Sequence, residues 1–360
     1  LRYAAEWDNV GLLVGSPDWS ADSIMLTIDL TQSVLDEAIN AGVQMIVAYH
    51  PPIFHATKSF TDSGPASIAL WAAHAGIAVH SPHTALDAAP DGINDWLANG
   101  LLTSDNKADV RSLDMFADQP ESEQCKIVTF APIEAVEQIR NGLASVGAGR
   151  IGNYQLCSFE IPGQGTFLGG EGTKPTVGRR GQLERVEEIR LEMVCPKNAL
   201  GLAIVALRQF HPYEEPPIEI HPLLPLPQRN IGQGRRVVFA QPPSLKTLLQ
   251  RVKQRLGVKT LQVGASAKTP KRFEMVGLCA GAGSSLLSSA IDQGCQAFIT
   301  GEMRHHDVLA AQARGCTVIL AGHTNTERGY LRTLLRRLKE HLPEADIAIS
   351  KRDVDPLRPM

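Results

Sequence analysis

The sequence lacks three features that would place it in a special class of protein: a long apolar run, an excess of basic charge and closely spaced cysteines. No apolar stretch approaches the roughly 18 residues of a membrane-spanning helix, and no signal-peptide pattern opens the chain. The formal net charge is −3, so no positive field predicts contact with nucleic acid. We therefore expect neither a membrane nor a nucleic-acid partner.

Cysteine is present, but it is not arranged for cross-links. The six cysteines are scattered without CxxC spacing, and most lie in apolar stretches with the composition of strands. This pattern predicts reduced, buried thiols in an intracellular, cytoplasmic protein, and it argues against a cysteine-rich structural zinc site. The length of 360 residues and the hydrophobic content of 43% predict two or three domains with ordinary cores. The sequence starts at Leu1 inside a motif, so we expect an N-terminal segment before it.

One short phrase occurs twice, as HTALD at 83–87 and as HTNTE at 323–327. In both copies a histidine is followed directly by a threonine, and an acid ends the phrase. A helix capping box explains the threonine and the acid, because the hydroxyl caps the first turn and the acid reaches back to the cap. Capping does not explain the histidine, so the two phrases together favour a shared chemical role.

The segments around the two phrases are also alike. Stretches 38–50 and 290–302 each predict the end of a helix, a glycine, a buried strand and a polar residue at the strand's end. Stretches 72–87 and 310–327 each predict a second strand that leads into the phrase. We interpret this as a duplicated α/β unit and not as a solenoid, because only two copies occur. The alternation of strands and helices predicts sheets with parallel or mixed strands.

The ends of the predicted strands would bring six polar side chains together: His50, His83, Asp87, Glu302, His323 and Glu327. Imidazole and carboxylate ligands suit Zn, Fe, Mn, Co or Ni, and two ions close together are typical of many metal-dependent hydrolases. In an extended strand, the histidine and the acid of each phrase would lie about 13 Å apart. We therefore expect both phrases on loops or at helix starts.

The middle of the chain has a different pattern of elements. It predicts strand, helix, strand, strand, helix, strand, with the second strand over 153–161 and a glycine-rich excursion over 163–181. This is the element order of a ferredoxin-like α+β domain. The predicted organisation is a duplicated three-layer α/β core of residues 1–123 and 229–360, split by a ferredoxin-like insert of residues 124–228.

Several motifs resemble those of one family. AEWDNVGLLVG near the start, HPPIF after the second strand, and GEMRHHD with AGHTNTE near the end are similar to the GTP cyclohydrolase I type 2 homologues, also called NIF-three-like dinuclear metal proteins. GRRGQLERVEEIRLEMVCP and HPYEEPPIEI resemble the PII-like insert of longer members. The resemblance covers essentially the whole chain. It implies an α/β fold, a toroidal homo-hexamer and two divalent transition-metal ions in each subunit.

By this resemblance the metal ligands are His50, Asp87, His323 and Glu327. In some members the histidine that matches His83 joins them. The family usually has two histidines before the Pro-Pro pair, whereas this chain has Tyr49 at the first of these positions. Two interpretations stay open. Either Tyr49 binds a strongly Lewis-acidic ion as a phenolate, or it only lines the site and one metal position is weak.

Four other clusters each have more than one interpretation. Glu302, His305 and His306 follow a strand end. They are either partners that orient ligands, or a general acid and base, or a helix start with surface histidines. The stretch CAGAGSS at 279–285 is an anion cradle or a tight turn. Residues 6–9 line the cavity or form a turn, and HPYEEP at 211–216 is expected to be structural or inter-subunit.

Two classes of function follow from these patterns. The first is a metal-dependent hydrolase, resembling GTP cyclohydrolase, that acts on a nucleotide or another small molecule. The second is a non-enzymatic metal-handling or regulatory protein whose PII-like insert senses a partner. An open coordination position beside a base favours the first class, and metal ions saturated by protein ligands favour the second.

Overall fold

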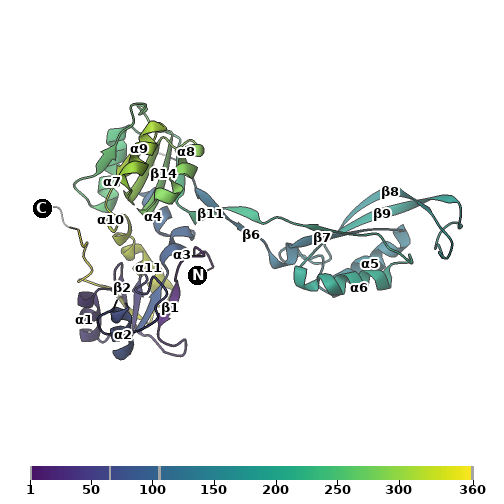
Figure 1. Ribbon diagram of the computed structural model, residues 1–360, viewed down its shortest axis with the longest axis horizontal. Coiled ribbons are helices and arrows are strands. Elements are labelled where there is room, and N and C mark those ends of the chain that lie inside the picture. Colours follow the sequence, from purple (N-terminus) through teal and green to yellow (C-terminus); the bar gives the residue numbers. More distant parts are fainter. Residues whose placement is uncertain (1, 65, 104–106, 358–360) are drawn as a thin grey trace. The chain divides into compact units, whose positions relative to one another are not determined.

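The computed structural model describes residues 2–64, 66–103 and 107–357. The chain divides into two compact units, one made of Leu1–Phe116 with Gln228–Met360 and the other of Ala117–Pro227. Both units are mixed α/β structures (Figure 1). Within the described residues, no helix is both long and apolar enough to cross a membrane.

The first unit contains a five-stranded sheet in the order β1-β4-β3-β2-β17. Strands β2, β3, β4 and β17 run parallel, and β1 pairs antiparallel with β4 at one edge. The parallel strands are largely apolar, as expected where helices cover both faces of a sheet. The bounds are Gly11–Val14 (β1), Ser23–Thr27 (β2), Met45–Ala48 (β3), Ala78–Ser81 (β4) and Asp346–Ile349 (β17).

The same unit contains a six-stranded sheet in the order β13-β16-β15-β14-β12-β5. Its strands β14, β15 and β16 run parallel, and the other three pair antiparallel with their neighbours. Both sheets therefore gather the carboxyl ends of adjacent parallel strands at one edge. The bounds are Ala108–Arg111 (β5), Arg235–Phe239 (β12), Gln262–Gly264 (β13), Met275–Ala282 (β14), Ala297–Glu302 (β15) and Thr317–Leu320 (β16).

Helices cover both faces of the two sheets. Helices α1 and α2 pack on one face of the first sheet, and α8 and α9 pack on one face of the second. Helices α4, α10 and α11 lie between the sheets (Figure 1), where a single apolar core joins residues of both. The bounds are Gln32–Asn40 (α1), Ser67–His74 (α2), His83–Ala88 (α3), Ile93–Asn99 (α4), Leu245–Leu256 (α7), Leu287–Asp292 (α8), His305–Ala313 (α9), Asn325–Arg328 (α10) and Leu331–His341 (α11).

The second unit is one antiparallel sheet with two helices, in the chain order β7-α5-β8-β9-α6-β10 and the sheet order β10-β7-β9-β8. Helices α5 and α6 cover one face of this sheet (Figure 1), over a core built from the unit's own residues. The bounds are Cys125–Ala131 (β7), Ile133–Ser145 (α5), Phe159–Leu168 (β8), Leu183–Cys195 (β9), Leu200–Phe210 (α6) and Ile218–Pro222 (β10).

The hairpin of β8 and β9 differs from the sequence expectation. Strand β8 begins at Phe159 and continues through Gly163 and Gly165 into the stretch that we expected to be irregular. Its pairing with β9 is unbroken over ten residues, so backbone hydrogen bonds hold the glycines in a strand that their intrinsic preference disfavours. Strands β6 (Asp114–Asp118) and β11 (Leu226–Gln233) pair with each other where the chain passes from one unit to the other.

Candidate metal centre

The candidate site lies at the carboxyl ends of parallel strands in both sheets of the first unit. Tyr49 and His50 follow β3 directly, and β4 leads into α3, which carries His83 and Asp87. His83 has a φ of +28°, which is uncommon for a residue other than glycine. Such backbone strain persists where the surrounding contacts fix it, and it is concentrated at functional sites.

The second sheet contributes the other half of the site. Glu302 is the last residue of β15, His323 follows β16, and Glu327 lies in the short helix α10. Thr324 occupies the N-cap position of α10, but its side chain makes no capping hydrogen bond. Glu327 faces two histidines instead. Helix capping therefore does not explain why HTNTE shares its pattern with HTALD.

Three side chains converge closely enough to hold one metal ion. Ligand atoms of His50, His323 and Glu327 all lie within 4.8 Å of one another. Nε2 of His323 lies 3.3 Å from Oε1 of Glu327, and Nε2 of His50 lies 3.6 Å from Oε2. Glu327 is 1% exposed, and its Oε2 has no hydrogen-bond partner among the described residues. A buried carboxylate oxygen with no hydrogen-bond partner carries a large desolvation cost, and a cation would remove that cost.

Each histidine at the site uses Nδ1 to bind a carboxylate. Nδ1 of His50 lies 2.8 Å from Oδ1 of Asp29, and Nδ1 of His323 lies 3.0 Å from Oε1 of Glu302. Since a carboxylate only accepts hydrogen bonds, both rings carry the proton on Nδ1 and present Nε2 to the site. Metal-binding histidines are oriented by carboxylates in this way in many proteins.

His83 repeats this arrangement in the wall of the site. Its Nδ1 lies 2.8 Å from Oδ1 of Asp8, whose other oxygen also accepts a hydrogen bond from the backbone N–H of Thr84 at 3.1 Å. Asp8 therefore holds both the ring of His83 and the start of α3. The structure thus assigns Asp8, from the predicted 6–9 cluster, a contact with a site residue.

Tyr49 and Asp87 form a buried pair. The phenol donates a hydrogen bond to Oδ1 of Asp87 at 2.5 Å, and the two residues are 4% and 9% exposed. Burial raises the pKa of Tyr49, and the nearby carboxylates of Asp87 and Glu327 raise it further. Burial also raises the pKa of Asp87 to about 7, although the bond from Tyr49 opposes this shift. Tyr49 therefore stays protonated and donates a hydrogen bond to Asp87.

The carboxylates around the two central imidazoles favour their charged forms. Burial alone lowers the pKa of His50, but the hydrogen bond to Asp29 and the carboxylate of Glu327, 3.6 Å away, outweigh burial and raise the pKa to about 10. The hydrogen bond to Glu327 raises the pKa of His323 to about 9, against the effect of burial. Burial opposes ionisation of Glu327, yet the two histidines keep its pKa below the ordinary value. The cluster thus holds positive charge between carboxylates, as a cation site does.

The stretch CAGAGSS does not form the anion cradle that the sequence allowed. The backbone N–H groups of Gly281 and Gly283 donate to the hydroxyls of Thr326 and Thr300, so they are not free to bind an anion. Gly281 serves a different purpose. It adopts a φ of +63°, and a Cβ there would lie 2.6 Å from Oε1 of Glu327. The absence of a side chain lets β14 pass beside the site.

His306 stands apart from the other predicted residues. It is exposed at the start of α9, its ring contacts that of His305, and it is not among the residues that line the cavity. Glu302 is at the site, but it contacts His323 and not the cavity. Within the described residues, then, the geometry brings Glu302 to a metal-ligand candidate and leaves His306 outside.

The site opens into a cavity of about 790 Å³, which is the size of a small-molecule site. Trp7 and Phe54 line it and are 65% and 47% exposed, with their ring centroids 5.9 Å apart. Nδ2 of Asn9 donates to the carbonyl of Ile53 at 2.6 Å and ties the two aromatic segments together. Further lining residues are Pro51, Thr84, Asp114, Gln233, Cys279 and Ser285.

Sequence reasoning missed Asp29 as a partner of His50. Asp29 lies two residues after the end of β2, in the stretch SIMLTIDL. The polar end of this otherwise apolar stretch is the one signal that points to it. The pairing itself joins different strands, so no local spacing reveals it.

Comparisons with known proteins agree with the motifs. Residues 1–356 match the family described as Duf34/NIF3 (NGG1p interacting factor 3). The chain is 33% identical over 360 residues to the GTP cyclohydrolase 1 type 2 homolog of Bacillus subtilis (strain 168), covering 98% of this chain and 93% of that protein. It is 34% identical over 370 residues to NIF3-like protein 1 of Rattus norvegicus, covering 99% of this chain and 89% of that protein.

Solved structures show the same similarity. The Bacillus cereus protein related to NIF3 superposes with a TM-score of 0.64 at 30% identity, covering 100% of this chain and 95% of that chain. The similarity therefore extends over both units of the molecule.

Proposed function

The chain belongs to the Duf34/NIF3 family, and from this premise we propose that it is a dinuclear metal-binding protein that hydrolyses a nucleotide or another small molecule. One observation carries the proposal: His50, His323 and Glu327 converge, and Glu327 has a buried oxygen without a hydrogen-bond partner. The name of the Bacillus subtilis relative refers to GTP cyclohydrolase, which supports a nucleotide as the class of substrate.

We assign the ligands to two adjacent positions. The first is built on His50 and Asp87 and the second on His323, with Glu327 shared between them. This division is supported by the two oxygens of Glu327, since Oε2 faces His50 and Oε1 faces His323. His83 is a further candidate because its Nδ1 is already engaged and its Nε2 remains available for a metal ion. The donor set of imidazoles and carboxylates suits Zn, Fe, Mn, Co or Ni.

The protein's own residues divide the work of such a site. Divalent ions held here would act as Lewis acids that lower the pKa of water and stabilise charge on a leaving oxygen. Asp29, Glu302 and Asp8 fix the tautomer and orientation of the three histidines. Tyr49 holds Asp87 by hydrogen bonding from its protonated form, so we assign it a positioning role. The cavity, with Trp7 and Phe54 at its wall, holds the substrate.

The proposal is tested with Glu327→Gln. The variant keeps the shape of the side chain but loses the charge that two positions share, so purified protein should carry less than half of the wild-type metal by elemental analysis. Hydrolysis of a panel of nucleotides, with GTP among them, should fall in parallel. Glu340→Gln is the control, because Glu340 is an exposed acid on α11 whose side chain is 61% exposed. Equal metal loading of wild type and Glu327→Gln would refute the assignment.

A non-enzymatic metal-handling or regulatory role is the alternative, and one observation favours it. His306, the base predicted from sequence, is exposed and lies outside the cavity lining. If the protein is an enzyme through His306, then His306→Ala should abolish hydrolysis while metal content stays unchanged. A metal-loaded wild type that converts no nucleotide of the panel, and that transfers its metal to an apo-acceptor protein, supports the alternative.

Assembly and domain organisation are part of the same proposal. We propose a toroidal homo-hexamer whose α/β core consists of duplicated halves, residues 1–123 and 229–360, around a PII-like insert of residues 124–228. The insert's separate core supports its independence. Multi-angle light scattering should give six subunits, and replacement of the insert by a short linker should leave a folded core that binds metal.

A further inference from the structure

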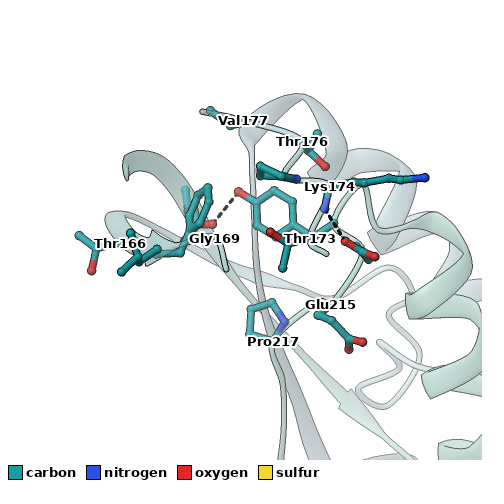
Figure 2. Close-up of a pocket in the computed structure, with 15 residues that line it drawn as sticks. Thr166, Gly169, Thr173, Lys174, Thr176, Val177, Glu215 and Pro217 are labelled. Atoms are coloured by element: carbon teal, nitrogen blue, oxygen red, sulfur yellow. Dashed lines mark hydrogen bonds between the residues drawn. The ribbon is translucent and has the colours of Figure 1, made fainter. Parts of the chain in front are cut away.

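The insert contains a cavity of its own, with a volume of about 410 Å³ (Figure 2). It lies among the end of β8, the loop that follows β8, and the loop between α6 and β10. The second loop carries HPYEEP, which the metal site does not use. The volume falls in the range of small-molecule sites.

Four hydrogen-bond donors in the wall of this cavity are already engaged. The phenol of Tyr213 donates to Oε1 of Glu188 at 2.7 Å. The hydroxyls of Thr173 and Thr176 donate to backbone carbonyls at 2.9 and 2.8 Å. The backbone N–H of Lys174 donates to Oε2 of Glu214 at 3.0 Å. These groups therefore offer a ligand the lone pairs of oxygen and no hydrogen atoms.

The charged residues of the wall also favour a ligand that donates hydrogen bonds and carries positive charge. Three carboxylates line the cavity, those of Glu188, Glu214 and Glu215. Lys174 is the one basic residue among the lining residues that the structure describes, and Figure 2 shows its side chain extended away from Thr166 and Gly169 on the opposite side. A ligand that enters meets three carboxylates and a single basic residue, Lys174. An anionic ligand such as a nucleotide is therefore disfavoured here.

Apolar surface makes up much of the remaining wall. The lining includes the ring of Tyr213 and the apolar side chains of Phe167, Leu168, Val177 and Pro217. Leu168 is 64% exposed and Val177 is 40% exposed, so apolar atoms stand open to a ligand. Burial of such atoms against a hydrocarbon chain is favourable, whereas a bare metal ion would leave them in water.

We propose that this cavity binds a small organic cation, an alkylammonium or alkylguanidinium, whose N–H groups bond to Glu188, Glu214 and Glu215 while its hydrocarbon chain packs on Tyr213 and Leu168. Such a ligand supplies positive charge and hydrogen-bond donors to the three carboxylates of the wall. The fit is specific because guanidinium and ammonium groups only donate hydrogen bonds, and the three carboxylates of the wall only accept them. The site is separate from the metal centre, whose residues all belong to the other unit.

The test is calorimetric titration of the full chain with agmatine, a butyl chain with a guanidinium and an ammonium group. We expect saturable binding at one site per chain, which weakens as salt is added. N-butylurea is the matched neutral probe, and it should bind at least tenfold more weakly. Glu188→Gln should weaken agmatine binding at least tenfold, since it removes charge and retains the oxygen that accepts from Tyr213.

Glu187→Gln is the matched control variant. Glu187 is the neighbour of Glu188 on β9 and points to the opposite face of the strand, where it accepts a bond from Gln164, so its loss should leave binding unchanged. Lys174→Met should bind agmatine as well as wild type or better. Unchanged thermal unfolding and metal content confirm that each variant is folded. The proposal is wrong if agmatine does not saturate, if N-butylurea binds equally, or if Glu187→Gln weakens binding as much as Glu188→Gln.

Discussion

Asp29 and His50 are joined by a hydrogen bond of 2.8 Å between Oδ1 and Nδ1, and this bond directs Nε2 of His50 toward Glu327. The two residues follow neighbouring parallel strands, β2 and β3, so the rigid sheet sets the orientation of the ring. A histidine oriented in advance loses less entropy when it binds an ion.

Removal of the Asp29 carboxylate should therefore weaken metal binding without removing a ligand. For Asp29→Ala we expect metal affinity to fall about 10- to 100-fold, measured by competition with a chromogenic chelator. Asp36→Ala on α1 is the control, because Asp36 is exposed and contacts only Gln32 among the hydrogen-bond partners described. Wild-type affinity in Asp29→Ala would show that the bond does not orient the ring.

A methyl group at position 281 should disrupt the site sterically. The Cβ of Gly281→Ala would lie 2.6 Å from Oε1 of Glu327 and 3.2 Å from Nε2 of His323, so we expect loss of most bound metal by elemental analysis. Gly42→Ala is a closely matched control, with a φ of +65° and nothing within 4 Å of the added Cβ. It should cost about 1 kcal/mol of stability through backbone strain and leave metal content intact.

Metal affinity should rise steeply with pH. In the metal-free protein the pKa of His50 is raised to about 10 and that of His323 to about 9, so both rings are protonated at neutral pH. Binding must displace these protons, and two protons predict up to roughly 100-fold tighter binding for each pH unit below about pH 9. Calorimetry in buffers of different ionisation enthalpy should report close to two protons released as both ligands engage.

The stability of the metal-free protein should change in the opposite direction. A raised folded-state pKa stabilises the protein fully below the unfolded value of about 6.5, and the stabilisation is lost as pH rises through the folded pKa. The contribution of His50 and His323 to the free energy of unfolding should therefore decline between about pH 6.5 and 10. Denaturant unfolding of apo-protein across this interval measures it, and His50→Gln should flatten the decline.

The hydrogen bond from Tyr49 should matter most when metal is absent. Tyr49→Phe leaves Oδ1 of Asp87 buried without its donor, which should cost the apo-protein about 1–3 kcal/mol in the free energy of unfolding. Added metal should recover part of this loss because Asp87 gains a cation. Tyr330→Phe, which removes another buried phenol that donates to the carbonyl of Asp91, should show a cost that metal does not change.

Replacement of Tyr49 by histidine tests whether the two metal positions differ in affinity. Tyr49→His supplies an imidazole that needs no costly deprotonation, so we expect higher occupancy at the weaker position. Crystallographic occupancies and metal titration compare the two proteins. Two equivalents of equal affinity in wild type, unchanged in Tyr49→His, contradict this reading of Tyr49.

The buried guanidinium of Arg235 should dominate the stability of the core unit. Arg235 is 0% exposed, bonds Asp95 at 2.5 and 3.0 Å, and donates to the carbonyls of Gly232 and Gly234 at 2.8 Å. Arg235→Met should cost about 3–5 kcal/mol, because Asp95 and the carbonyls lose their partner. The exposed pair of Arg314 and Asp292 supplies the contrast, and Arg314→Met should cost less than about 1 kcal/mol in denaturant unfolding.

The sequence predicted those elements whose structure depends on residues within one continuous segment. Helix α1 follows from the apolar spacing of Val34, Leu35 and Ala38 and from Gly42, which takes the left-handed conformation. The repeated phrases likewise pointed to strand ends, and His50, His323 and Glu327 do meet. Motifs alone also identified the family.

Other features depend on contacts that no local pattern encodes. Asp8 and Asp29 lie far in the sequence from the histidines that they contact. Their hydrogen bonds to His83 and His50 form only when the fold brings these residues together. Strand β8 runs through glycines because β9 supplies its hydrogen bonds, and glycine by itself predicts a loop. His306 seemed close to the site by position in the chain, but α9 directs it elsewhere.

Strand β17 pairs with β2 at the edge of the first sheet, with Ile349 opposite Leu26. During synthesis on the ribosome, β2 emerges long before β17. Until β17 is made, β2 has an unpaired edge, and unpaired strand edges favour wrong pairing. The insert closes its own core as soon as β10 has emerged. During vectorial synthesis the insert can therefore fold before the first sheet gains β17.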